Sequence, residues 1–189
     1  IGNRSSGKQG MAIANAAKNR GAQVQLIAAN CDVASLTGID VIHVETTLEM
    51  QSALQAHFDS CEILIMSAAV ADARPMQISE QKIKKATLNN IELQQNPDLL
   101  AELSPRKGKR VMVGFAAETK EHLQEARRKL ESKGLDVIYV NDVSGGAIFG
   151  QDTTMGTILL RNDADIAVKE VSKDALSNVL LDHAIRQLG

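Results

Sequence analysis

The chain has 189 residues and a formal net charge of −2, and this length suits a single domain with a full hydrophobic core. The near-neutral charge does not mark it as a nucleic-acid binder, and no apolar run approaches the roughly 18 residues of a membrane span. Its two cysteines, Cys31 and Cys61, lack metal-ligand spacing, so we expect reduced thiols in a cytoplasmic protein.

Helical and strand-like patterns alternate along the chain. Ser5 or Ser6 is expected to cap a first helix that runs to about Arg20 and stops at Gly21. The predicted strands are residues 24–28, 40–44, 63–66, 111–115, 137–141 and 155–160, the last of them toward the edge of the sheet. The other predicted helices are residues 47–58 (capped by Thr46 or Thr47), 96–103, 120–133 and 172–188. The inward residues are expected to be Met11, Ile13, Ala14 and Ala17 in the first helix and Ala175, Val179, Leu180 and Ala184 in the last.

Strands that alternate with helices predict an α/β fold with a three-layer, doubly wound and mostly parallel sheet of the Rossmann-like kind. The first helix has almost no strand before it, so we expect the first strand of this sheet to lie upstream of Ile1. The sequence starts at Ile rather than Met, and we expect residues 1–189 to be one domain of a longer polypeptide.

Residues 63–85 carry the clearest candidate site. A continuous apolar run, the pattern of a strand covered on both faces, ends in small residues and then in Asp72. Open α/β sheets bind ligands at the carboxyl ends of their strands, and small residues let a ligand approach backbone N–H groups. The lysines that follow suggest an anionic ligand and a lid over a phosphate, although such a run is also typical of a solvated surface. These lysines are Lys82, Lys84 and Lys85.

The opening GNRSSGKQG nearly matches a P-loop, but Gln9 stands where a Ser or Thr hydroxyl should reach Mg²⁺. A P-loop NTPase is therefore disfavoured. Ser5, Ser6 and Gly7 form either an anion site at a helix start or only a capping turn. Asn3 is equally open, because its carboxamide suits a cap or a substrate carbonyl.

Two further features allow two interpretations each. Phe115 follows a buried strand among small residues, so it is either a core residue or a flat surface for a nucleotide base. Lys129 and Lys133 lie four residues apart on one helical face, where a pair is more often solvent-exposed than ligand-binding.

Six short blocks occur in order along the chain: residues 3–8 (NRSSGK), 67–72 (SAAVAD), 82–85 (KIKK), 96–98 (NPD), 113–119 (VGFAAET) and 141–144 (NDVS). Together they closely resemble phosphopantothenoylcysteine synthetase, the ligase of coenzyme A biosynthesis, over nearly the whole chain. The resemblance implies a two-step reaction. CTP converts the carboxylate of 4′-phosphopantothenate to an acyl-cytidylate with release of pyrophosphate, and the amino group of cysteine then displaces CMP.

The resemblance also implies residue roles. Lys82, supported by Lys84 and Lys85, would stabilise charge on the departing pyrophosphate, and Asn3 would orient the activated carbonyl. Asp72 would act in part through a triphosphate-bound Mg²⁺. The implied CTP-binding residues are Met66, Ser67, Ala68, Asp72, Lys82, Pro97, Asp98, Leu99, Leu100, Phe115, Lys129 and Lys133. A phosphate of the substrate or of the nucleotide would lie on Ser5, Ser6 and Gly7.

The implied partners are a second copy of the chain in a homodimer and a fused or associated flavin-dependent decarboxylase domain. Two other functions stay open. An NAD(P)-binding oxidoreductase suits the sheet, but no G-x-G-x-x-G follows a visible strand. The chain is alternatively a non-catalytic fragment that needs upstream residues. The preference for CTP rests on the resemblance alone, since relatives elsewhere use ATP.

Overall fold

The computed structural model describes residues 5–34, 36–77, 79, 81, 90–118, 123–142 and 151–188. Its strands are β1 (Gln25–Ala29), β2 (Asp40–Val44), β3 (Ile63–Met66), β4 (Ala73–Pro75), β5 (Leu93–Gln95), β6 (Val111–Glu118), β7 (Val137–Asp142), β8 (Thr153–Leu160) and β9 (Ile166–Ser172). Its α-helices are α1 (Lys8–Asn19), α2 (Thr47–His57), α3 (Leu99–Leu103), α4 (Leu123–Ser132) and α5 (Lys173–Arg186). None of these helices is long and apolar enough to cross a bilayer.

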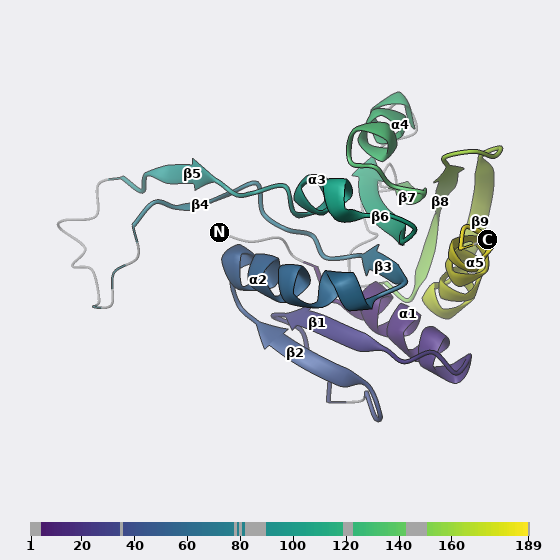
Figure 1. Ribbon diagram of the computed structural model, residues 1–189, viewed down its shortest axis with the longest axis horizontal. Coiled ribbons are helices and arrows are strands. Elements are labelled where there is room, and N and C mark those ends of the chain that lie inside the picture. Colours follow the sequence, from purple (N-terminus) through teal and green to yellow (C-terminus); the bar gives the residue numbers. More distant parts are fainter. Residues whose placement is uncertain are drawn as a thin grey trace.

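The main sheet has five strands in the order β3-β6-β7-β8-β9. The strands β3, β6 and β7 are parallel, whereas β8 and β9 add antiparallel pairs at one side. The parallel pair β1-β2 is hydrogen-bonded as a separate sheet, and the antiparallel pair β4-β5 forms an arm that projects from the body (Figure 1).

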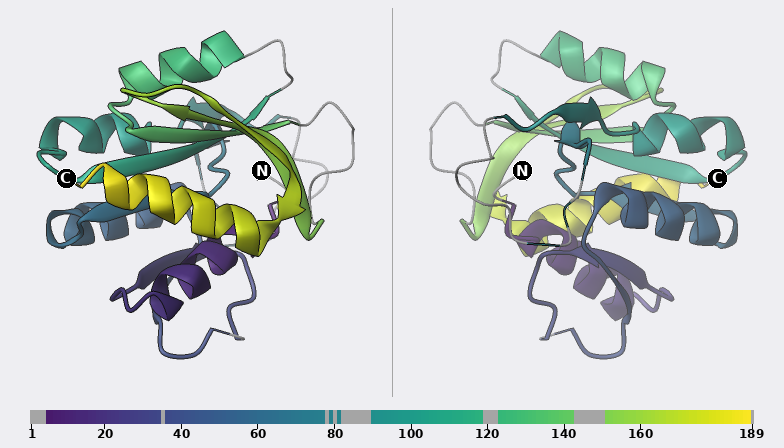
Figure 2. Two further views of the ribbon diagram at one scale, coloured as in Figure 1. Left: turned by 90° about the vertical axis from the view of Figure 1, so that its right-hand side faces the viewer. Right: turned by 90° about the vertical axis from the view of Figure 1, so that its left-hand side faces the viewer.

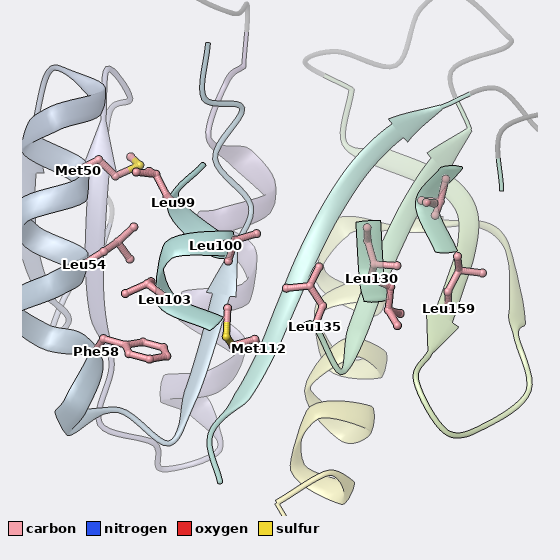
Figure 3. Packing of buried hydrophobic residues seen from close by; sticks show 13 residues of the cluster. Met50, Leu54, Phe58, Leu99, Leu100, Leu103, Met112, Leu130, Leu135 and Leu159 are labelled. Carbon is pink, nitrogen blue, oxygen red and sulfur yellow. The ribbon is translucent and has the colours of Figure 1, made fainter. Parts of the chain in front are cut away.

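Helices cover both faces of the main sheet (Figure 2). The helices α2, α3 and α4 pack their leucines and Met50 on one face, which we call the first core (Figure 3). The helices α1 and α5 pack on the other face, the second core. Along β7, Ile138 and Val140 belong to the first core and Val137 and Tyr139 to the second, because successive side chains of a strand point to opposite faces. The predicted three-layer α/β fold is confirmed.

The strands predicted at residues 40–44 and 63–66 have the observed bounds. Gly21 follows the end of α1 with a φ of 85°, as a helix-terminating glycine should. The capping residue of α2 is Thr46, whose hydroxyl accepts from the Glu49 N–H while the Glu49 carboxylate accepts from the Thr46 N–H. These elements are determined locally, by an apolar run or by a cap.

The predicted inner face of the last helix is partly wrong. Leu180 and Ala184 are fully buried, as predicted, but Val179 is 38% exposed. Leu176 and Ser177 are buried in place of Ala175 and Val179, because α5 packs on α1 as well as on the sheet. The same contact explains a buried serine, since Gln9 of α1 donates a hydrogen bond of 3.0 Å to Ser177 Oγ.

Candidate functional site at the carboxyl edge of the sheet

The start of α1 differs from its predicted form. The N-cap is Gly7, in the left-handed region with a φ of 71°, and no side chain of the described residues caps the helix, so the prediction that Ser5 or Ser6 does so is wrong. A Cβ on Gly7 would lie only 2.7 Å from the Cβ of Cys31, so tertiary packing as well as backbone conformation favours glycine here. The start of α1 suits an anion, because N–H groups and the positive end of the helix dipole point outward there.

Successive side chains at the end of β3 point to opposite sides of the sheet. Met66 packs against the first core, whereas Ser67 turns toward α1. A Cβ on Gly10 of α1 would lie 2.8 Å from Ser67 Oγ, so glycine allows the helix to approach the strand end closely. Ala68 is exposed just beyond. Small residues at this edge therefore allow a close approach, which α1 itself makes at Ser67.

Asp72 lies beside the segment that leads into α3. Its carbonyl oxygen accepts a hydrogen bond of 2.8 Å from the Asn96 N–H, and Asn96 Nδ2 donates to the Ala71 carbonyl at 2.8 Å. Arg74 donates to Asn96 Oδ1 at 2.9 Å. Asn96 thus joins the turn at Asp72 to Pro97, a role that the sequence interpretation missed although a polar residue before proline was visible. The carboxylate of Asp72 is exposed.

The predicted residues at α3 have two distinct environments. Asp98 is the N-cap of α3, where its Oδ1 accepts from the Ala101 N–H at 3.2 Å, and its Oδ2 lies 3.0 Å from Lys133 Nζ. Pro97 precedes this cap and so lies just outside the helix. Leu99 and Leu100 are buried in the first core, so only their backbone groups suit a ligand. Lys129 lies one helical turn before Lys133, whose N–H donates to the Lys129 carbonyl.

Phe115 is half-buried on the side of the second core. Its ring contacts Tyr139 edge-on, with ring centroids 5.7 Å apart and an interplanar angle of 67°. This contact fixes the orientation of the Phe115 ring. The residue serves the core and also keeps part of its surface accessible, so base stacking stays a prediction.

The candidate residues thus form two groups on opposite faces of one sheet edge. The α3 group is Asp72, Pro97, Asp98, Leu99, Leu100 and Lys133. The α1 group is Ser5, Ser6, Gly7, Ser67 and Phe115. The ends of β3 and β6 join the two groups. The predicted catalytic residues Asn3 and Lys82, together with Lys84 and Lys85, lie outside the described residues.

Two lysines and an aspartate lie beside the α1 group. Lys8 Nζ lies 2.7 Å from Asp152 Oδ1, and its hydrogen bond and charge lower the pKa of that carboxyl. The Lys173 N–H at the start of α5 donates to the Asp152 carbonyl at 3.0 Å, which brings the starts of two helices to the same edge. Burial, and then the charge of Lys8, lower the pKa of Lys173. The charge of Asp152 acts in the opposite direction and raises the pKa of Lys173, so this carboxylate already offsets part of the positive charge.

A magnesium ion delivered with a nucleotide needs few protein ligands, because Mg²⁺ commonly binds one or two carboxylates and completes its shell with phosphates and waters. Among the described residues there is no cluster of three or more potential metal ligands. Asp72 offers one exposed carboxylate, and that of Asp98 is paired with Lys133. The α3 group therefore offers one carboxylate, which is enough for a Mg²⁺ that phosphates also bind.

The double role of Asp98 gives a first prediction. Asp98→Ala removes the cap and the ion pair, and we expect it to lower the free energy of unfolding by about 1 kcal/mol. Asp98→Asn retains a capping oxygen and loses only a half-exposed ion pair, for which we expect about 0.5 kcal/mol or less. Urea denaturation of both variants measures the difference. Equal losses would show that the cap contributes nothing.

Comparison with known proteins shows which family the chain matches. The family whose profile matches residues 1–188 is the DNA/pantothenate metabolism flavoprotein C-terminal domain. The Coenzyme A biosynthesis bifunctional protein CoaBC of Mycobacterium bovis is 38% identical over 96% of this chain and 47% of its own length. CoaBC of Vibrio cholerae is 40% identical over 99% of this chain and 48% of its own length. The chain therefore spans about half the length of the curated relatives it matches.

Solved structures agree with the fold. The crystal structure of the C-terminal domain of CoaBC superposes with a TM-score of 0.82 at 29% identity, covering 97% of this chain and 84% of that one. A Cab2 variant in complex with phosphopantothenate-cysteine superposes with a TM-score of 0.73, covering 100% of this chain and 79% of that one, at 12% identity, which shows a shared fold. The resemblance drawn from the six sequence blocks is confirmed: the chain belongs to the family of the DNA/pantothenate metabolism flavoprotein C-terminal domain.

Proposed function

We propose that the chain is a phosphopantothenate–cysteine ligase of coenzyme A biosynthesis that uses CTP. The observation that carries the proposal is the family membership, together with the two groups of candidate residues at one sheet edge. The relatives are named for coenzyme A biosynthesis, and a structure of the same fold was solved with phosphopantothenate-cysteine.

The proposed reaction has two steps, and each step releases a leaving group. A carboxylate oxygen of 4′-phosphopantothenate attacks the α-phosphorus of CTP, and the bond to the bridging oxygen of the β-phosphate breaks to release pyrophosphate. The amine of cysteine then attacks the acyl carbon, the bond to the cytidylate oxygen breaks, and the amine loses a proton as CMP leaves. Activation is needed because a free carboxylate has no good leaving group.

The site residues have distinct tasks in this proposal. In the α3 group, Asp72 would meet a triphosphate-bound Mg²⁺, and the backbone of Pro97, Leu99 and Leu100 would read the edge of cytosine. In the α1 group, the start of α1, with Gly7 as its N-cap, would hold a phosphate. Lys82 would stabilise charge on the pyrophosphate, and Asn3 would orient the acyl-cytidylate carbonyl. Met66, Ser67 and Ala68 would line the junction of the two groups, with Lys129 and Lys133 behind it.

The proposal includes two partners and a location. The arm formed by β4 and β5 ends in large exposed apolar residues, which supports a contact with a second copy of the chain. These residues are Met76, Ile91 and Leu93, which are 51%, 57% and 48% exposed. A flavin-dependent decarboxylase domain would complete the longer protein, in line with the bifunctional names of the relatives. We place the protein in the cytoplasm.

The decisive test compares CTP and ATP in parallel assays with 4′-phosphopantothenate, cysteine and Mg²⁺. We expect pyrophosphate and the amide product with CTP, and much slower turnover with ATP. Thermal melting with CTP or NADPH provides a second readout, since a ligand that binds only the folded state raises the melting temperature. Stabilisation by NADPH with no CTP-dependent pyrophosphate would overturn the proposal and favour an oxidoreductase. Binding of CTP without turnover would instead favour the non-catalytic fragment.

A further inference from the structure

A chain of hydrogen bonds runs from the second core to the carboxyl end of β7. The Tyr139 hydroxyl, on a residue only 1% exposed, lies 2.8 Å from Thr154 Oγ1. Thr154 Oγ1 in turn donates to Asn141 Oδ1 at 3.0 Å. A threonine hydroxyl has a single hydrogen, so the hydrogen between Tyr139 and Thr154 must come from the phenol. Both hydrogen bonds therefore point in the same direction, toward the carboxamide of Asn141.

This arrangement determines which end of the Asn141 carboxamide stays available. Its Oδ1 is occupied by Thr154, so its Nδ2 hydrogens are the groups left to donate. Asn141 is half-buried, and its Nδ2 is not among the fully buried, partnerless polar atoms of the described residues. A carboxamide without such an anchor can rotate by 180° and exchange a donor for an acceptor at almost no steric cost. With Oδ1 bonded to Thr154, the Nδ2 hydrogens are the donors at this edge.

Asn141 lies on β7, the same strand as Tyr139, whose ring contacts Phe115. In the register of the sheet, Phe115 of β6 is opposite Tyr139, and Ala117 is opposite Asn141. Tyr139 therefore contacts Phe115 through its ring and reaches Asn141 through its hydroxyl. Burial raises the pKa of Tyr139, so the phenol keeps its proton near neutral pH and remains a donor. One buried residue thus supports two groups at the ligand edge.

We propose that Tyr139 and Thr154 are positioning residues of the nucleotide site, which hold the Phe115 ring and the Asn141 amide for a base or ribose. The inference rests on the proposed function, because it takes the ligand of this edge to be a nucleotide. A base offers a flat face to Phe115, and the ribose carries oxygen acceptors for Asn141 Nδ2. Neither positioning residue needs to touch the nucleotide.

The test uses a substitution that removes one hydroxyl and retains the shape. Thr154→Val breaks the anchor of Asn141, and we expect the KM and the Kd for CTP to rise about tenfold, the effect of one lost hydrogen bond. The kcat at saturating CTP should stay within about twofold, since the loss concerns binding. Thr154→Ser retains the hydroxyl and should restore both constants. The matched control is Thr153→Val on the same strand, whose hydroxyl bonds to the exposed Glu170 and should not affect CTP.

A second variant separates positioning from folding. Tyr139→Phe retains the ring contact with Phe115 and removes only the hydroxyl, so it should weaken CTP binding several-fold, and its effect should not add to that of Thr154→Val. Calorimetric titration with CTP gives the Kd without turnover. The variants could melt at a lower temperature than a wild-type protein that binds and uses CTP, and still bind CTP equally well. That result would show a purely structural role for the two hydroxyls and overturn the inference. Failure of the wild-type protein to bind CTP would overturn the proposed function and the inference with it.

Discussion

Gly156→Ala is expected to lower the free energy of unfolding by about 3 kcal/mol, since overpacking in a closed interior typically costs about 1–3 kcal/mol and here the obstacle is backbone. A Cβ on Gly156 would lie 2.1 Å from the Val140 carbonyl oxygen and 3.0 Å from the Tyr139 hydroxyl. Gly156 is opposite Asn141 in the pairing of β7 with β8, and a register shift between Thr154 and Gly156 interrupts the pairing of β8 with β9 on the other side. The strands β7 and β8 would have to separate at the end of their pairing to admit one methyl group.

Urea denaturation measures this loss, with Gly21→Ala as a control. Gly21 has a φ of 85°, but no atom lies within 4 Å of the position that a Cβ would take there. Gly21→Ala therefore tests backbone strain without a collision, for which we expect about 1 kcal/mol. A loss below that of Gly21→Ala would mean that β8 can move away from β7 at little cost. Because Tyr139 is in the collision, surviving Gly156→Ala protein should also bind CTP weakly.

Lys82→Ala is expected to slow pyrophosphate release from CTP by about 10²–10³-fold, the usual effect of losing one group that stabilises developing charge. The departing pyrophosphate gains negative charge as its bond to the α-phosphorus breaks, and an ammonium placed there lowers that barrier. The segment that carries Lys82 begins and ends on the paired strands β4 and β5, and the base of this arm is fastened to Asp72 through Asn96. Single-turnover assays with CTP and 4′-phosphopantothenate isolate this step.

Two other variants sharpen the result. Lys109→Ala removes an exposed lysine just before β6, at the opposite end of the sheet from the candidate site, and should leave the rate unchanged. Asn3→Ala should permit pyrophosphate release and let the acyl-cytidylate accumulate, because its carboxamide acts on the carbonyl in the second step. Equal loss of both steps in Lys82→Ala and Asn3→Ala would contradict the separate roles.

Much of the layered fold could be predicted because the relevant signals are local. The continuous apolar run of β3 and the cap of α2 depend on neighbours in the chain. The run was predicted correctly, and the cap was predicted as Thr46 or Thr47 and is Thr46. The edge strand β9 was missed because its exposed, alternating pattern resembles a loop with scattered apolar residues. The strands of the arm were missed as well, since they are three residues each and depend on contacts between Asn96, Arg74 and the turn at Asp72.

The place of the candidate site could be predicted from the sequence, because small and polar residues follow the predicted strands and ligands bind where parallel strands end. Folding then determined features that no local pattern encodes. Gly7 became the cap of α1 because Cys31 packs against it, and the candidate residues separated onto two faces because Met66 and Ser67 point in opposite directions. The hydrogen-bond chain from Tyr139 through Thr154 to Asn141 joins two strands. Such a chain depends on the distance between side chains in the folded sheet, and only the tertiary structure sets that distance.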